Sequence, residues 1–213
     1  NDGFLLEQLG WRDSEIESHY TLSHFDVPCV EESQFFLIVG TKRYSLAELK
    51  EVGEEHHLDM VMECAGNGRT LLETEWARSQ PWSTGGFGHS RWSGVRLSSV
   101  LADAGVDGSH LLFIGADSGR QSGKIEPYMR EMRRQDVNDD VLLAWNRNGQ
   151  PLSRKHGFPL RLVVGSFYGM ASVKWLVEIR PLQAPVGPLQ KRIYTYRLDG
   201  MVRAVREKLV RRR

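Results

Sequence analysis

The stretch Leu58-Asp-Met-Val-Met-Glu-Cys64-Ala-Gly-Asn-Gly-Arg69 decides the fold of this chain. Leu58, Met60, Met62 and Cys64 alternate with Asp59, Val61 and Glu63, and this period of two predicts a strand with one buried face. Two glycines follow, which let the backbone turn sharply and approach a ligand closely. The stretch therefore predicts a strand that ends in a tight glycine loop and carries the thiol of Cys64 at its end.

Cys64 is a candidate metal ligand. A thiolate is a soft ligand that suits a redox transition metal better than magnesium or calcium. Arg69, five residues further on, would favour the anionic form of the sulfur. The alternative is a buried cysteine that packs as a small hydrophobic residue beside a loop. The local sequence leaves both interpretations open.

The rest of the chain predicts an α+β fold with mixed β-sheets, short helices and much irregular chain. Ser45 and Glu48 form a capping box at the start of a short helix, and a second helix over 97–104 ends at Gly105. Asn148-Gly149 is a strong hairpin signal. Branched and apolar runs predict further strands over 35–40, 111–114, 142–145, 160–164 and 173–179.

Composition excludes several classes of protein. The 213 residues carry a net charge of +1, which gives no argument for binding nucleic acid or an acidic membrane. No apolar run approaches the roughly 20 residues that span a bilayer, so we expect a soluble protein, either cytoplasmic or periplasmic. Cys29 and Cys64 are the two cysteines. They allow one disulfide at most, and they form no CxxC pair of the kind that binds zinc.

A second candidate site is His156-Gly-Phe-Pro-Leu-Arg161, followed by Lys174. Glycine and proline fix the path of the loop, so His156 and Arg161 can point into one space. Arginine offers a planar fork that binds phosphate with two hydrogen bonds, and Lys174 adds a point charge. The alternative is a hairpin strand with an exposed arginine.

A third candidate is the segment from Trp82 to Val95, where glycines at 85, 86 and 88 precede His89 and Arg91. Such a loop could cradle an anion, or it could be a tight turn rimmed by tryptophans. It lacks the Gly-Lys-Ser/Thr of a phosphate-binding loop, and it does not open a helix as a dinucleotide-binding fingerprint does.

Together these segments resemble the molybdopterin-binding domain of the sulfite oxidase and assimilatory nitrate reductase family. Residues 20–195 contain the family's motifs in order and at compatible spacing. The matching stretches are Cys64 to Arg69, Gly85 to Val95, Phe113 to Asp117, His156 to Val164 and Gly169 to Leu176.

The resemblance implies one pyranopterin cofactor with molybdenum, and Cys64 as the protein's sulfur ligand to the metal. It implies that Arg69 and Tyr194 are catalytic, because they match family residues that donate hydrogen bonds to an anionic substrate. The residues expected to hold the pterin and its phosphate are His24, Asp117, His156, Arg161, Ser172, Val173 and Lys174.

We predict a molybdopterin-binding domain over residues 1–188 and a tail over 189–213 that carries Tyr194 and an amphipathic helix. The chain leaves no room for the family's C-terminal dimerisation domain. Leu22-Ser23 stands where the sulfite enzymes carry Arg-Asn, and Gly68 replaces a second arginine beside Arg69. The sequence therefore does not favour sulfite as the substrate over nitrate, an S-oxide or an N-oxide.

The predicted function is a molybdenum-dependent oxidoreductase that transfers an oxygen atom to or from a small oxyanion or S-oxide. The chain has no haem-attachment CxxCH, so we expect no haem here and a separate electron-transfer protein such as a cytochrome. One rival is a transferase or hydrolase with Cys64 as nucleophile and His156 as its partner. Another is a non-catalytic domain that keeps the fold.

Overall fold

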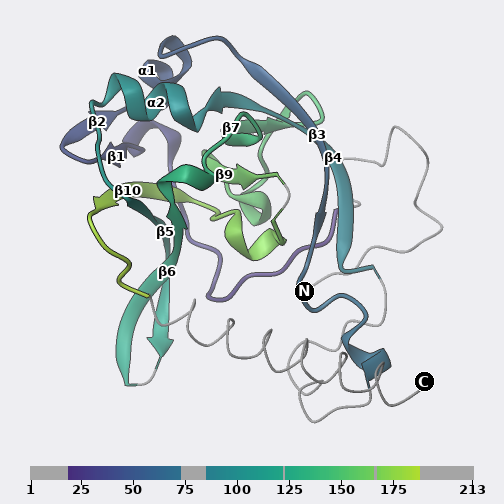
Figure 1. Ribbon diagram of the computed structural model, residues 1–213. Helices are drawn as coiled ribbons and strands as arrows, with labels where there is room; N and C mark the ends of the chain where they lie inside the picture. Colours follow the sequence, from purple (N-terminus) through teal and green to yellow (C-terminus); the bar gives the residue numbers. More distant parts are fainter. Residues whose placement is uncertain (1–18, 73–84, 122, 166, 188–213) are drawn as a thin grey trace, which may run out of the picture.

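The computed structural model describes residues 19–72, 85–121, 123–165 and 167–187 as two β-sheets with two short helices (Figure 1). The helices are α1 (Leu46–Glu51) and α2 (Leu97–Asp103). The strands are β1 (Leu37–Val39), β2 (Lys42–Tyr44), β3 (His56–Glu63), β4 (Phe87–Arg96), β5 (His110–Gln121), β6 (Lys124–Arg133), β7 (Val141–Arg147), β8 (Gln150–Pro151), β9 (Arg161–Val164) and β10 (Leu176–Leu182).

The first sheet has the strand order β2-β1-β10-β5-β6 and is mixed, because β1 and β10 pair in parallel while the other pairs are antiparallel. The second has the order β3-β4-β7-β8, with β9 also paired to β7, and all its pairs are antiparallel. The long β5–β6 and β3–β4 arms extend on opposite sides of β7 and β9 (Figure 1). The predicted α+β fold is confirmed.

Several local predictions are confirmed. Ser45 and Glu48 form the capping box of α1, and Gly105, at φ +60°, follows the end of α2. Asn148 and Gly149 both have positive φ in the turn between β7 and β8. No helix in the described ranges is long and apolar enough to cross a membrane.

Three strands were missed, and some predicted strand boundaries were wrong. The sequence did not predict β2, β4 or β6, and the strand expected from Val173 begins only at Leu176. Trp175 has a φ of +49°, so the chain turns there before it becomes extended.

Strands β7 and β9 are buried on both faces, and each face belongs to a different apolar cluster. Because side chains alternate across a strand, Leu143 and Leu162 join the larger cluster with both helices, whereas Leu142 and Val163 join a smaller one. The smaller cluster also contains Tyr20, Met62, Cys64, Trp92, Ala144 and Leu152. Two-sided burial thus separates the main core from a second interior that contains Cys64.

An irregularity in the β4–β7 pairing changes which way β7 faces. Ser93 is opposite Asn146 and Gly94 is opposite Ala144, so Trp145 is an extra residue between them. A bulge of this kind reverses the alternation beyond it. Arg147, opposite Trp92, therefore lies on the side of the smaller cluster instead of the main core.

The bulge requires glycine at position 94, because a Cβ there would overlap the carbonyl oxygen of Leu143 and the Cα of Ala144. We predict that Gly94→Ala lowers the free energy of unfolding by about 2 kcal/mol or more, since backbone must move to admit the methyl group. Gly53→Ala is the control, because a Cβ there has only ordinary contacts at 3.6 Å. Denaturant unfolding of the two variants should differ clearly; equal midpoints would contradict the predicted strain.

Candidate functional site

Cys64 follows the last residue of β3 and is held by backbone hydrogen bonds. Its N–H donates to the carbonyl of Gly86 at 2.7 Å, and its own carbonyl accepts from the N–H of Asn67 at 2.9 Å. The N–H of Gly66 donates to its Sγ at 3.4 Å. The thiol is buried, and neither Cys64 nor the exposed Cys29 forms a disulfide. A backbone donor aimed at the sulfur stabilises negative charge there.

The loop after Cys64 is fastened to both strands of the β3–β4 arm. The side chain of Asn67 accepts a hydrogen bond from the N–H of Gly86 at 3.0 Å and donates to the carboxylate of Glu63 at 3.0 Å. Arg69 folds back so closely that a Cβ at Gly66 would overlap its guanidinium. The Ala-Gly-Asn-Gly-Arg sequence thus fixes the sulfur and brings the cation of Arg69 against Gly66, whose N–H donates to that sulfur.

Residues 19–28, which we call the strap, cross from the β3–β4 arm to the β5–β6 arm (Figure 1, purple). The ring of His19 occupies the space that a Cβ at Gly88 would need, and the ring of Phe25 does the same at Gly119. Tyr20 packs in the cluster of Cys64, and burial followed by the charge of Cys64 raises the pKa of its phenol. The strap therefore brings a buried tyrosine close to the candidate metal ligand.

Arg161 is buried at the start of β9 and points into the smaller cluster, which rules out the alternative of an exposed arginine. Its guanidinium donates to the carbonyls of His156 at 2.9 Å and Ser172 at 3.1 Å. It lies 4.7 Å from the ring centroid of Trp92 and 3.6 Å from the sulfur of Met62. Burial lowers its pKa to about 10.

His156 is buried beside Arg161, and both of its ring nitrogens have partners. Nε2 lies 3.4 Å from a guanidinium nitrogen of Arg147, and Nδ1 lies 2.7 Å from the hydroxyl of Ser153. Because the guanidinium can only donate, Nε2 accepts and Nδ1–H donates to Ser153. Burial, then the charge of Arg147, lowers the pKa of His156 to about 2.

The half-buried Lys174 and the buried Asp117 carry opposite charges that act on each other. The ammonium of Lys174 donates to the carbonyls of Leu22 at 3.1 Å and Lys155 at 3.0 Å, and to the hydroxyl of Ser23 at 2.7 Å. Burial, then the charge of Arg161, lowers the pKa of Lys174 to about 7. Burial raises the pKa of Asp117 to about 6, and one of its carboxylate oxygens has no partner in the described chain.

Three other residues that were predicted to hold the cofactor are Ser172, Val173 and His24, and their surroundings differ from one another. Ser172 and Val173 are buried and support β9, since the Ser172 hydroxyl accepts from the Val164 N–H at 3.1 Å and the Val173 carbonyl accepts from the Leu162 N–H at 2.8 Å. His24 is exposed and lies 3.4 Å from the side-chain oxygen of Gln121. It lines a surface hollow with Thr21, Ser23, Phe25, Asp26, Val27 and Lys155.

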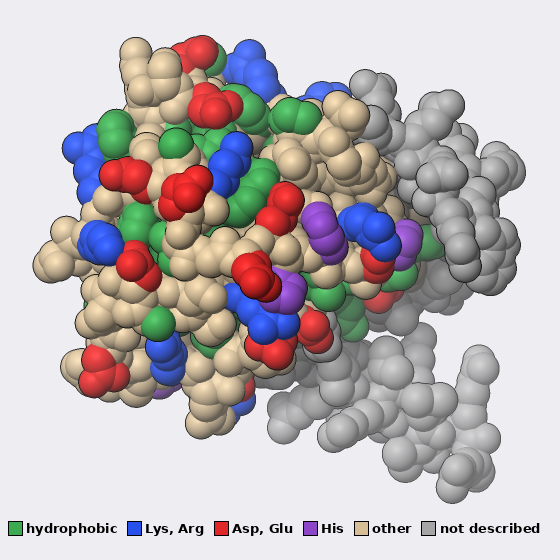
Figure 2. Space-filling model, turned by 90° about the horizontal axis from the view of Figure 1, so that it is seen from above, with side chains coloured by type: hydrophobic (Ala, Val, Ile, Leu, Met, Phe, Trp, Pro, Cys, Tyr) green, Lys and Arg blue, Asp and Glu red, His purple; other side chains and the backbone are tan. Residues whose placement is uncertain are grey.

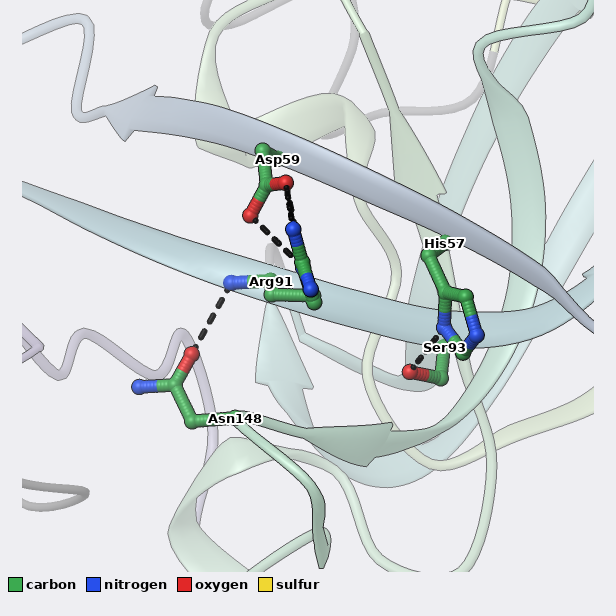
Figure 3. Close-up of polar contacts among 5 residues, drawn as sticks. All are labelled: His57, Asp59, Arg91, Ser93 and Asn148. Atoms are coloured by element: carbon green, nitrogen blue, oxygen red, sulfur yellow. Dashed lines mark hydrogen bonds and ion pairs between the residues drawn. The ribbon is translucent and has the colours of Figure 1, made fainter. Parts of the chain in front are cut away.

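The anion cradle considered between Trp82 and Val95 was wrong for the part that the structure describes. Residues 87–96 are strand β4, and His89 and Arg91 are exposed. Arg91 forms a two-pronged ion pair with Asp59 at 2.7–3.1 Å, and its N–H donates to the side chain of Asn148 (Figure 3). On the face shown in Figure 2, positive, negative and histidine side chains are interspersed, and no large patch of one sign stands out.

Cys64, His156 and Arg161 lie in or beside the second interior, and the charges of Arg161 and Asp117 act on Lys174. Val173 belongs to the main core instead, and His24 is exposed. Tyr194, the tail over 189–213 and the boundary at residue 188 lie outside the described residues. The sequence missed Tyr20 and His19 because nothing local marks the strap as part of the site. It missed Arg147 because the bulge at Trp145 gives no periodic signal.

The polar groups of this interior fit an anionic pterin cofactor. His19 Nε2, Trp92 Nε1 and an oxygen of Asp117 are buried without a partner in the described chain. Such groups normally have one, and the 2-amino-4-oxo edge of a pterin offers both donors and acceptors. Among the described residues, the buried arginines are Arg130, Arg147 and Arg161, and the buried carboxylate is Asp117. An anion would balance this excess of positive charge.

The family model of the oxidoreductase molybdopterin binding domain matches residues 24–187. The chain belongs to this family. Chicken sulfite oxidase is 36% identical over 79% of this chain and 40% of its own length. Barley nitrate reductase is 33% identical over 77% of this chain and 20% of its own.

A solved member of similar fold is the sulfane dehydrogenase SoxCD from Paracoccus pantotrophus. It matches with a TM-score of 0.63 and 28% identity over 76% of this chain and 41% of that chain. The chain thus spans less than half the length of these relatives. The match to this molybdopterin-binding family, with sulfite oxidase and nitrate reductase among the relatives, agrees with the resemblance that the sequence predicted.

The buried histidines make stability depend on pH. Burial lowers the pKa of His19 to about 3 and that of His156 to about 2, far below the 6.5 of an unfolded chain. Below pH 6.5 the unfolded state therefore binds protons first, and the stability present above pH 6.5 is lost on acidification. Asp117, with its pKa raised to about 6, has the opposite sign and offsets part of this loss between about pH 6 and 4.

We predict that His156→Gln removes the contribution of one titrating histidine to the pH dependence of stability. Between pH 6 and 5, the cofactor-free variant should lose about 1 kcal/mol less unfolding free energy than the parent protein. Urea unfolding at the two pH values measures the difference. The same substitution at the exposed His57 is the control, and an unchanged slope in His156→Gln would contradict the prediction.

Proposed function

We propose that this chain catalyses molybdenum-dependent oxygen-atom transfer to or from a small oxyanion or S-oxide. The observation that carries the proposal is a buried thiol at one end of an interior whose other end holds buried cations. When bound, a single molybdopterin with molybdenum supplies the redox and oxygen-transfer chemistry, and the protein supplies binding and orientation. Cys64 is the proposed metal ligand.

Each end of the proposed site has a distinct task. The Gly66 N–H and the cation of Arg69 favour the thiolate at Cys64, which is the form that binds a metal. At the other end Arg161 and Lys174 offer positive charge to the cofactor's phosphate. His24, Asp117, His156, Ser172 and Val173 complete the proposed set.

The substrate would meet residues from two parts of the chain. Arg69 lies beside the Cys64 loop and is proposed to position an anionic or polar oxygen of the substrate by hydrogen bonding. Tyr194 is proposed to act with it from the tail over residues 189–213, with residues 1–188 as the cofactor-binding domain. Leu22 stands in the strap where the sulfite enzymes carry an arginine. We therefore propose that substrate binding here depends less on charge than the binding of sulfite does.

Electrons would pass to or from a separate redox protein, such as a cytochrome. The sequence similarity to sulfite oxidases and a nitrate reductase supports this part of the proposal. The rival in which His156 activates Cys64 as a nucleophile has less support, because Ser153 and Arg147 engage both nitrogens of the ring.

Replacing the proposed metal ligand tests the function directly. Cys64→Ser, made in a host that synthesises molybdopterin, should lose turnover and the visible absorbance of the bound metal, because a hydroxyl is a poor substitute for a thiolate. Cys29→Ser is the control, since that thiol is exposed and lies against the carboxylate of Glu31. Normal turnover with unchanged absorbance in Cys64→Ser would remove this residue from the mechanism.

Replacing the buried arginine tests the cation end of the site. Arg161→Met should retain at least about tenfold less molybdenum and pterin after gel filtration, because charge-assisted hydrogen bonds to phosphate are lost. Arg180→Met is the control, since that arginine is exposed and paired with Glu178. Equal pterin and molybdenum content in the two variants would rule out a phosphate-binding role for Arg161.

A further inference from the structure

Three buried polar atoms at the inner face of β4 have no hydrogen-bond partner in the described part of the chain. They are the Oγ of Ser90, the Nε1 of Trp92 and the Nε2 of His19. Ser90 is 1% exposed, Trp92 is fully buried and His19 is 6% exposed, so bulk water does not reach them. Buried polar groups normally have a partner. Three such groups together therefore point to a ligand that binds there.

The three residues belong to one surface because of how the strap crosses β4. Gly88, Ser90 and Trp92 alternate along the strand and are all buried, so they point to the same face. The ring of His19 occupies the space that a Cβ at Gly88 would need, and its centroid lies 5.7 Å from the ring of Trp92. The strap thus places the imidazole over the part of β4 that carries the serine and the indole.

Two residues that were proposed to hold the cofactor border this surface. The ring of His156 lies 5.7 Å from that of His19, and the guanidinium of Arg161 lies 4.7 Å from the ring centroid of Trp92. A cofactor that contacts His156 and Arg161 is therefore next to the unpartnered groups as well.

The hydrogen-bonding character of the three groups selects the part of the cofactor. Nδ1 of His19 lies 3.1 Å from the carbonyl oxygen of Tyr20, which only accepts, so Nδ1 carries the hydrogen and Nε2 is an acceptor. The Nε1–H of Trp92 only donates, and the hydroxyl of Ser90 does both. The 2-amino-4-oxo edge of a pterin has N–H donors beside a carbonyl acceptor and complements this set. A phosphate group offers mainly acceptors and would leave His19 Nε2 without a donor.

From these contacts we infer that His19, Ser90 and Trp92 bind the 2-amino-4-oxo edge of the pterin ring. His19 Nε2 accepts from an N–H of that edge, and Trp92 Nε1–H donates to an acceptor on it. The inference rests on the proposed function and adds three residues that were not predicted to hold the cofactor. It also separates a ring-binding face on β4 from the cations proposed for the phosphate.

Free pterin, without phosphate or metal, is the probe, with full-length protein made in a host that lacks molybdopterin. The change in pterin fluorescence on titration gives a dissociation constant. His19→Phe, Ser90→Ala and Trp92→Phe should each weaken binding by roughly fivefold or more, because each loses one hydrogen bond to the ring. Bound pterin should also raise the melting temperature of the parent protein more than those of the variants.

Melting without pterin distinguishes a binding role from a structural one. Ser90→Ala and Trp92→Phe should melt at the same or a higher temperature than the parent, because a buried polar group without a partner is removed. Ser93→Ala is the matched control on the same strand, since the buried Ser93 hydroxyl lies 2.8 Å from the ring of His57 (Figure 3). The control should melt lower and bind pterin as the parent does.

The opposite pattern overturns the inference. If Ser90→Ala and Trp92→Phe melt lower than the parent and bind pterin with the parent's affinity, the two polar groups serve the fold through an ordered water. A parent protein that does not bind free pterin also overturns it. Should an aromatic variant not fold, Ser90→Ala, which removes a single hydroxyl, decides the question, and unchanged pterin affinity in that variant would then refute the assignment.

One further measurement separates this inference from the proposed function. In a molybdopterin-producing host, pterin content should fall in Trp92→Phe relative to the parent and to Ser93→Ala. Equal pterin content in the three proteins defeats only the role of the β4 face. A parent protein that contains neither pterin nor molybdenum defeats the proposed function itself.

Discussion

The burial of β7 and β9 on both faces is the constraint on which the rest of this structure depends. One face of the pair completes the main core with Leu143 and Leu162, and the other face closes the interior that holds Cys64. Arg161 can be buried because the apolar side chains around β9 fix the strand independently. The strand is anchored by one core while it presents a charge to the other. The cofactor interior is therefore a second core in which polar groups replace part of the apolar packing.

Among the described residues, the buried charges are mostly positive. Buried arginines lose hydration worth several kcal/mol each, and the Coulomb repulsion between them adds to that cost. Asp117 is the buried carboxylate among the described residues, and burial raises its pKa to about 6. An anionic ligand among these cations would offset part of that cost. Binding and folding are thus coupled through the same charges.

The sequence predicted those parts of the site that rest on local chemistry. The alternation from Leu58 to Cys64 and the two glycines after it gave both the strand and the position of the thiol. The loop from His156 to Arg161 was also predicted, because glycine and proline fix its path. The alternation of β9 places Arg161 inward, although only the structure shows that the opposite face of the strand is buried too.

Other parts depend on pairing that no single segment contains. Arg91 was considered for an anion site, but the register of β4 against β3 places it opposite Asp59 on the outer face. Arg147 was overlooked because a bulge shifts side-chain direction by one residue, and only the partner strand reveals the shift. Sequence motifs and hydrophobic periodicity therefore identify candidate functional residues. The register between paired strands decides on which face of the sheet their side chains lie.

The strap shows why these long-range contacts matter for chemistry as well as for packing. Lys174 donates all three of its hydrogen bonds to the strap and to the turn at Lys155, so its charge is fixed instead of mobile. The same bonds hold Leu22 and Ser23, which follow Tyr20 closely in the chain, and Tyr20 packs in the cluster of Cys64. The cation that would attract a phosphate thus also fixes the segment that closes the thiol end. Because one side chain serves both ends, a change at either end of the site is expected to be felt at the other.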